Sequence, residues 1–183
     1  GGVLRLSPSV SVLVSAFWLL ACTGATKFSD GLDGLVAGQT VIGAALVAGL
    51  CLTAAFFQPD IALLAALFGG SFLGVLWHGW PRARLFLGEF GSTFAGFGLG
   101  VLALVSGAKF AIALMAMGFF VADIIGVMAR RLWRGASPFR GDRTHLHFVL
   151  LAAGMPAWAV AFLLWGLALG FGFAALQLQT QGK

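Results

Sequence analysis

Two aspartates, Asp30 and Asp33, stand three residues apart in a polar stretch that follows an apolar run, and each precedes a glycine. Carboxylate oxygens are the ligands that hard cations such as Mg²⁺ prefer, and glycine allows close backbone approach to a phosphate. The pair therefore fits a site for a metal ion or a phosphate ester. On these residues alone, two Asp-Gly turns that end a helix are the alternative.

A second polar stretch, from His78 to Ser92, carries Arg82, Arg84 and Glu89. Guanidinium groups bind phosphate oxygens as a fork, so the two arginines fit a diphosphate or a lipid phosphate. Arginines beside an apolar segment also anchor it at a membrane surface, which is the alternative. The Glu89 carboxylate could either ligate Mg²⁺ or cap the start of a helix through the helix dipole.

A third polar stretch, from Arg130 to His147, is dense in groups that bind phosphate. His145 and His147 are two residues apart, so they do not share a helix face, and neither the zinc-type spacing nor a nearby cysteine is present. Phosphate contact or proton transfer fits these histidines better than a metal. A basic loop that only anchors the chain at a membrane is the alternative. The charged residues of this stretch are Arg130, Arg131, Arg134, Arg140, Asp142 and Arg143.

The composition determines the class of protein that must hold these groups. The 183-residue chain is 60% hydrophobic and 9% charged, with a mean hydropathy of +1.01. A soluble domain has about 45–50% apolar and about 25% charged residues. A soluble globular domain, a disordered chain and a disulfide scaffold are therefore excluded. What remains is a polytopic α-helical membrane protein, with room for about six spans at ~20 residues each.

The apolar segments agree with this estimate. We predict an all-α, polytopic integral membrane protein of about six transmembrane helices with three catalytic-type cytoplasmic loops, forming one transmembrane domain over residues 1–183. The expected spans are Val10–Thr23, Thr40–Phe57, Ile61–Trp77, Ser92–Ser106, Phe110–Met128 and Trp158–Leu176.

The basic residues orient these spans. On a soluble protein, the net charge of +5 would suggest binding to nucleic acid. In a membrane protein, the same charge indicates which loops face the cytoplasm, so no nucleic-acid partner is expected. Positive residues concentrate in the long loops, which places those loops in the cytoplasm and both termini outside. The loop positives are Lys27, Arg82, Arg84, Arg130, Arg131, Arg134, Arg140 and Arg143, against Arg5, Lys109 and Lys183 on the other side.

Nearly all the acidic groups and histidines fall on the cytoplasmic side. Of the acids, only Asp60 lies outside and only Asp123 lies within a span. A transporter would place polar groups near the middle of the membrane on broken helices. The partition instead favours a site at the cytoplasmic interface, where a soluble substrate meets a lipid one.

Together the three stretches resemble the polyprenyl-phosphate sugar-1-phosphate transferases, the MraY/WecA family of glycosyltransferase family 4. Gly24–Val36 is similar to the family stretch Asn-x-x-Asn-Phe-x-Asp-Gly-Leu-Asp-Gly-Leu-Ala. Gly79–Ser92 is similar to Asn-Phe-x-Pro-Ala-Arg-Ile-Phe-Met-Gly-Asp-x-Gly-Ser. Arg130–His147 matches Arg-Arg-x-x-x-Gly-x-Ser-Pro-Phe-x-x-Asp-Arg-x-His-Leu-His-His, and Asp123 before it also fits.

The resemblance implies transfer of a sugar 1-phosphate from a UDP-sugar to undecaprenyl phosphate, with release of UMP and use of Mg²⁺, in the bacterial cytoplasmic membrane. The His-Leu-His form looks more like the branch that uses UDP-N-acetylhexosamines. Whether the protein forms a homodimer is left open. The implied catalytic residues are Asp30, Asp33, His145 and His147, the phosphate-binding residues Arg84, Arg140, Asp142 and Arg143, and the metal ligand Glu89.

Four motif positions depart from the family pattern. Lys27 and Gly79 stand where the family has asparagines, Glu89 replaces the metal-binding aspartate, and Phe148 replaces the last histidine. Glutamate keeps its carboxylate, whereas a lysine ammonium repels a cation and supplies no ligand.

Family members are longer, and their first half holds an adjacent Asp-Asp pair that this chain lacks. We therefore expect the chain to be the C-terminal portion of a longer transferase. The alternative is a degenerate, non-catalytic family member that binds a lipid phosphate or serves as an assembly protein.

Overall fold

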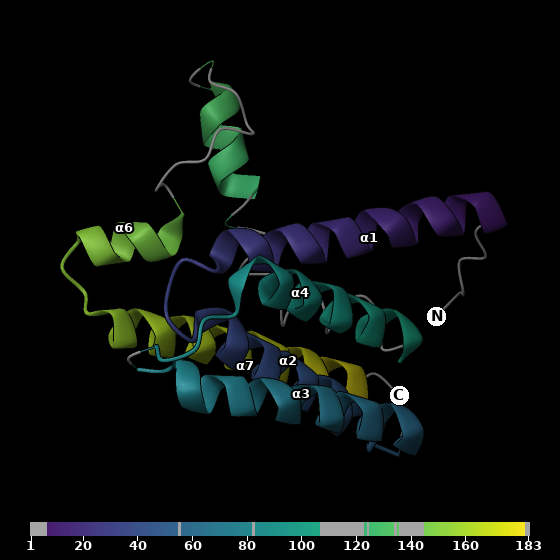
Figure 1. Ribbon diagram of the computed structural model, residues 1–183. Helices are drawn as coiled ribbons and strands as arrows, with labels where there is room; N and C mark the ends of the chain where they lie inside the picture. The colour runs from purple at the N-terminus through teal and green to yellow at the C-terminus, as the bar shows by residue number, and fades with distance from the viewer. Residues whose placement is uncertain are drawn as a thin grey trace.

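The computed structural model describes residues 7–54, 56–81, 83–106, 123, 125–133, 135 and 145–181, with side chains up to 177 (Figure 1). Every regular element in these ranges is helical, which confirms the all-α prediction. Residues 125–133 are also helical. The labelled helices are α1 (Pro8–Ser29), α2 (Leu35–Cys51), α3 (Pro59–Gly79), α4 (Gly88–Val105), α6 (Leu146–Ala152) and α7 (Ala157–Gln181).

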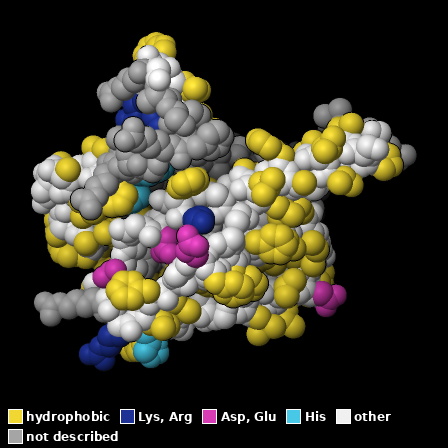
Figure 2. All heavy atoms as spheres, turned by 45° about the horizontal axis from the view of Figure 1, so that its top comes forward, with side chains coloured by type: hydrophobic (Ala, Val, Ile, Leu, Met, Phe, Trp, Pro, Cys, Tyr) yellow, Lys and Arg dark blue, Asp and Glu magenta, His cyan; other side chains and the backbone are white. Residues whose placement is uncertain are grey.

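Four of these helices, α1, α3, α4 and α7, are long and apolar enough to cross a membrane, and α2 is a shorter apolar helix. Large apolar side chains cover much of the face shown in Figure 2, and Phe17 and Trp77 are 76% and 82% exposed. Such a surface is stable against lipid and not against water. The polytopic membrane fold is therefore confirmed. Most of the expected span Phe110–Met128 lies outside the described residues.

The helices begin and end at other residues than hydropathy predicts. We expected the first span to end at Thr23, but α1 continues to Ser29. The Thr26 hydroxyl bonds to the Cys22 carbonyl oxygen at 3.2 Å, and the Ser29 hydroxyl bonds to that of Ala25 at 2.8 Å. These bonds satisfy the polar groups inside the helix, so the helix does not have to end where polarity begins. The first part of the first motif (Gly24–Val36), from Gly24 to Ser29, is therefore helical.

The helices α2 and α4 likewise begin earlier than the expected starts at Thr40 and Ser92. The helix α2 starts at Leu35 and α4 at Gly88, which places Glu89 in the first turn of α4. Acidic residues are favoured there because they complement the positive end of the helix dipole. The polar motif residues thus serve as helix ends, and the loops between helices are shorter than predicted.

Close helix packing fixes how these ends meet. The helix α2 packs on α3, α4 and α7, and α1 packs on α4. A Cβ on Gly96 of α4 would collide with Thr26 and the Cys22 backbone of α1. Small residues of this kind let membrane helices approach closely. The indole Trp18 Nε1 donates to the Gly100 carbonyl oxygen at 3.1 Å, which fixes the α1–α4 register.

A second contact fixes α7 against the start of α2. The indole Trp165 Nε1 of α7 donates to the Leu35 carbonyl oxygen at 3.0 Å, and the ring packs on Gly38. The helices alternate in direction, so the C-terminal ends of α1 and α3 lie with the N-terminal ends of α2, α4 and α7 at one end of the bundle (Figure 1). The N-terminal end of α1 and the C-terminal end of α7 are at the other end (Figure 1). The motif-bearing residues are thus gathered at one end.

Candidate functional site

The first motif turns the chain between α1 and α2. Asp30 caps the C-terminal end of α1, and Gly34 precedes α2 with a φ of +71°. A side chain at position 34 would be strained in this left-handed conformation, and its Cβ would lie 2.8 Å from Cβ of Trp80. The glycine therefore allows Asp30 and Asp33 to lie on one tight turn against the second motif.

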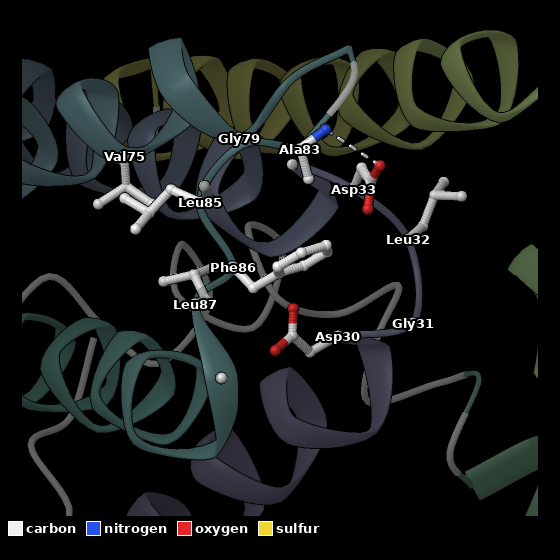
Figure 3. A pocket seen from close by; sticks show the side chains of 13 residues that line it. Asp30, Gly31, Leu32, Asp33, Val75, Gly79, Ala83, Leu85, Phe86 and Leu87 are labelled. Atoms are coloured by element: carbon white, nitrogen blue, oxygen red, sulfur yellow. Dashed lines mark hydrogen bonds between the residues drawn. The ribbon is translucent and has the colours of Figure 1, made fainter.

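This turn and the segment before α4 line an open cavity of about 330 Å³. Figure 3 shows Asp30 and Asp33 on the same turn, facing the segment from Ala83 to Leu87. Asp33 Oδ2 accepts a hydrogen bond of 3.3 Å from the Ala83 backbone N–H. The Asp30 pKa is raised by burial, and a hydrogen bond with Ser92 offsets part of this rise. Two carboxylates in different environments thus border one cavity.

An ion pair joins the ends of α1 and α4 beside this cavity. Nζ of Lys27 lies 3.1 Å from Oε1 of Glu89, and the side chains are 48% and 85% exposed. Lys27 lies in the last turn of α1 and Glu89 in the first turn of α4. Each charge therefore complements the dipole of its own helix as well as the other charge. Glu89, the expected metal ligand, is bonded to an ammonium group.

A carboxylate further along the chain holds the third motif. Asp123 Oδ2 lies 2.9 Å from Nδ1 of His145, and Asp123 Oδ1 accepts a 2.9 Å bond from the Leu146 backbone N–H. The Asp123 and His145 side chains are 8% and 10% exposed. The carboxylate thus orders both the first residue of α6 and the imidazole beside it. The residues that Asp123 positions thus lie at the start of α6.

The second histidine of the motif is buried and lies against the first motif. His147 is 2% exposed, and its Nε2 has no hydrogen-bond partner among the described residues. A Cβ on Gly31 would lie 2.8 Å from this atom, so only glycine permits the contact. Burial lowers the His147 pKa to about 4, repulsion from His145 acts in the same direction, and Asp123 opposes it. His147 is therefore neutral at pH 7.

Aromatic contacts complete the link between the first and third motifs. The rings of Phe28 and His145 stack with centroids 6.0 Å apart, and those of His145 and His147 with centroids 5.9 Å apart. Phe148, where the family has histidine, packs on His147 with centroids 4.2 Å apart. The imidazoles are held as one stack beside the Asp30–Gly34 turn.

The structure thus brings together Asp30, Asp33, His145 and His147. Arg84 is exposed, and its backbone N–H donates to the His78 carbonyl oxygen at 3.0 Å. Arg140, Asp142 and Arg143 lie outside the described residues. Sequence reasoning missed the partners that position the site, namely the Ala83 backbone and the Ser92 hydroxyl. A backbone N–H leaves no signal in a sequence, whereas Ser92 belongs to the Gly-Ser that closes the second motif.

No group of three or more His, Cys, Asp or Glu side chains that could hold a metal ion occurs among the described residues. Mg²⁺ requires near-octahedral oxygen coordination, and an ammonium offers no lone pair. The Lys27–Glu89 pair therefore does not fit a divalent cation bound at Glu89.

Comparison with known proteins decides the family. The family model described as glycosyl transferase family 4 matches residues 1–107 of the 183. The chain belongs to glycosyl transferase family 4. The resemblance drawn from the three motifs is confirmed at this level.

Similar family 4 proteins are phospho-sugar transferases by name. A phospho-N-acetylmuramoyl-pentapeptide-transferase of Moorella thermoacetica is 34% identical over 172 residues, covering 92% of this chain and 52% of the relative. A probable undecaprenyl-phosphate N-acetylglucosaminyl 1-phosphate transferase of Bacillus subtilis is 29% identical over 148 residues, covering 78% and 41%. A decaprenyl-phosphate N-acetylglucosaminephosphotransferase of Mycobacterium leprae is 29% identical over 206 residues, covering 95% and 50%. The chain spans about half the length of these curated relatives.

Proposed function

We propose that the protein containing this chain transfers a sugar 1-phosphate from a UDP-sugar to undecaprenyl phosphate. A terminal oxygen of undecaprenyl phosphate attacks the phosphorus attached to the sugar, and the bond from that phosphorus to the bridging oxygen breaks. UMP leaves with the bridging oxygen, and the product is a polyprenyl diphosphate sugar. The reaction belongs to cell-envelope polysaccharide or glycan synthesis.

The observation that carries this proposal is the meeting of three separated motifs at one end of an apolar bundle. Asp30 and Asp33 border a cavity of about 330 Å³, and Gly31 of the same turn touches His147. Cavities that bind small molecules range from about 300 to 1,000 Å³. This one is large enough for part of a nucleotide sugar. Its place at a helix end lets a membrane lipid reach the same point.

The two histidines would present different atoms to the substrate. Because the Asp123 carboxylate accepts a hydrogen bond from His145 Nδ1, this nitrogen carries the proton, and Nε2 is the atom that can take up a proton. Only after Nε2 is protonated can it donate to a phosphate oxygen. His147 is buried and neutral, so it can serve as a hydrogen-bond partner and not as a fixed positive charge. Asp33, held by the Ala83 N–H, would orient a sugar or ribose hydroxyl.

Phosphoryl transfer needs positive charge near the diphosphate, and Mg²⁺ supplies it when bound. The side chains around Glu89 do not fit such an ion, so a metal at Glu89 has no part in the proposed mechanism. The charge on this face of the described bundle comes from basic side chains such as Lys27 and Arg84.

The membrane orientation and the sugar are further parts of the proposal. The excess of Lys and Arg in the motif loops supports a cytoplasmic active face in the bacterial inner membrane. The His145-Leu146-His147 form supports a UDP-N-acetylhexosamine as the donor.

The test is a transfer assay on the full-length protein with Asp33→Asn, His145→Ala and the control Asp60→Asn. Asp60 is exposed in the first turn of α3, at the opposite end of the bundle. We expect the first two variants to lose about 100-fold or more in turnover, as loss of a preorganised polar contact typically does. The control should stay within about twofold. Unchanged turnover in Asp33→Asn and His145→Ala would refute the site.

A non-catalytic protein that binds a lipid phosphate is a second candidate function. The Lys27–Glu89 pair favours it, because an ammonium replaces a neutral side chain at the site. Binding of undecaprenyl phosphate to a full-length protein that turns over none of the tested UDP-sugars would support this candidate against the first.

A further inference from the structure

The ion pair between Lys27 and Glu89 is built into the packing of α1 against α4. Thr26, one residue before Lys27, lies close against Gly96 of α4. A Cβ at position 96 would collide with the Thr26 hydroxyl. Glu89 lies two turns before Gly96 on the same helix. The helix ends that carry the two charges are therefore held in place, and the 3.1 Å contact follows from that register.

This pair is exposed and contributes little to stability. The Lys27 and Glu89 side chains are 48% and 85% exposed, and ion pairs in water are screened and weak. The pair adjoins the site, because residues close to both partners line the cavity. Gly88 is the neighbour of Glu89, and Asp30 follows Lys27 by three residues. Its charges are thus available to a ligand at the mouth of the cavity.

The two residues differ from the family motif together. The positions of Lys27 and Glu89 correspond to an asparagine and to the aspartate that the resemblance makes a metal ligand. The first change adds one positive charge, and the second keeps the negative charge on a longer side chain. The longer side chain contacts the new ammonium at 3.1 Å.

We propose that the Lys27 ammonium takes the place of a divalent cation at Glu89, so that it supplies one resident positive charge where the metal would supply two. The exclusion of metal from Glu89 stands on the ion pair alone. Contact of Lys27 with a substrate phosphate rests in addition on the proposed function. The Lys27 ammonium would bind phosphate as a compact charge with three N–H donors, and such a contact requires no fixed geometry.

Electrostatics gives the size of the effect. A single positive charge about 5 Å from a divalent cation repels it even with the full screening of water. The resulting penalty corresponds to at least about a tenfold loss of metal affinity. Lysine also provides no oxygen ligand in place of the asparagine amide.

The experiment measures binding of Mn²⁺, as the metal alone, to the purified full-length protein by the electron paramagnetic resonance signal of free Mn²⁺. The variants are Glu89→Gln, Lys27→Asn, the double variant of both, and the charge-preserving control Lys27→Arg. Metal sites elsewhere in the protein are common to all variants and cancel in the comparison. No substrate is present, so a protein that fails to turn over still gives a result.

We expect Glu89→Gln and Lys27→Arg to bind Mn²⁺ as the wild type does. Lys27→Asn should gain binding that is at least about tenfold tighter than any wild-type binding at this site, and the double variant should lose that gain. Weaker Mn²⁺ binding in Glu89→Gln than in the wild type would overturn the proposal, because Glu89 would then hold metal beside Lys27. The absence of a gain in Lys27→Asn would overturn it as well.

Discussion

The carboxylate of Asp123 holds His145 at one oxygen and the Leu146 backbone N–H at the other, each at 2.9 Å. Asp123 and His145 are 22 positions apart in sequence, and both side chains are almost fully buried. The contact makes Asp123 a positioning residue, because it fixes the imidazole while the other ring nitrogen stays available.

Removal of the Asp123 charge should therefore disturb the orientation and protonation of the His145 imidazole while the imidazole itself stays in the site. In Asp123→Asn, the amide can still accept one hydrogen bond, but it no longer favours the proton on Nδ1. We expect turnover to fall about 10–100-fold, the range seen when residues that orient a functional histidine are changed. The ¹⁵N chemical shifts of His145 provide a second readout, because they should show the proton redistributed between Nδ1 and Nε2. Unaltered shifts and turnover would exclude a positioning role.

The close approach of Gly31 to His147 predicts a large effect of one methyl group. In Gly31→Ala, the new Cβ would lie 2.8 Å from both Nε2 of His147 and Cζ of Phe148. Overpacking of this kind costs about 1–3 kcal/mol, so the Tm of the full-length protein should fall. Transfer should fall as well, because the imidazole must move.

Gly70 provides the matched control, because it lies in α3 with no atom within 4 Å of a Cβ built there. Gly70→Ala should lower neither Tm nor transfer, since the new methyl group meets no neighbour and alanine is the better helix former. Equal Tm values for Gly31→Ala and the wild type would contradict the contact between the first and third motifs.

The buried His147 predicts that stability depends on pH. Burial lowers its pKa from the ordinary 6.5 to about 4, so the unfolded chain binds more protons than the folded protein between these values. Stability from this group is complete above about pH 6.5 and is lost as the pH falls toward 4. The Tm should therefore drop between pH 7 and pH 4.5, and the drop should be smaller in His147→Gln.

His78 is the control for this titration, because its side chain is exposed at the end of α3. His78→Gln should keep the wild-type dependence of Tm on pH. If His147→Gln instead kept the full wild-type dependence and His78→Gln lost it, the buried position of His147 would be wrong.

The helical bundle could be predicted because long apolar segments between polar loops have few other solutions in a membrane. Alternating helices also predict that the three motif stretches meet at one end. The positions of helix ends could not be predicted from polarity, because Thr26 and Ser29 bond to carbonyls within their own helix. Polar residues such as threonine and serine occur both in loops and inside helices, so their type alone does not show where a helix ends.

The residue types of the site could be predicted from the sequence, but the contacts between these residues could not. The Asp30–Asp33 pair and the two histidines follow from the motifs, whereas their positioning partners do not. The 3.3 Å bond to Asp33 comes from a backbone N–H that any residue at position 83 would offer. The pairing of Lys27 with Glu89 depends on the register of α1 against α4, which is fixed by glycine contacts that a sequence does not specify.

The nucleotide released from a UDP-sugar tests the central claim most directly. The full-length protein would be incubated with undecaprenyl phosphate and UDP-N-acetylglucosamine, and in parallel with UDP-N-acetylmuramoyl-pentapeptide, while UMP and UDP are quantified. We predict UMP in an amount equal to a new polyprenyl diphosphate sugar, because the phosphate next to the sugar moves with it. Release of UDP, or no lipid product from either donor, would contradict sugar-1-phosphate transfer.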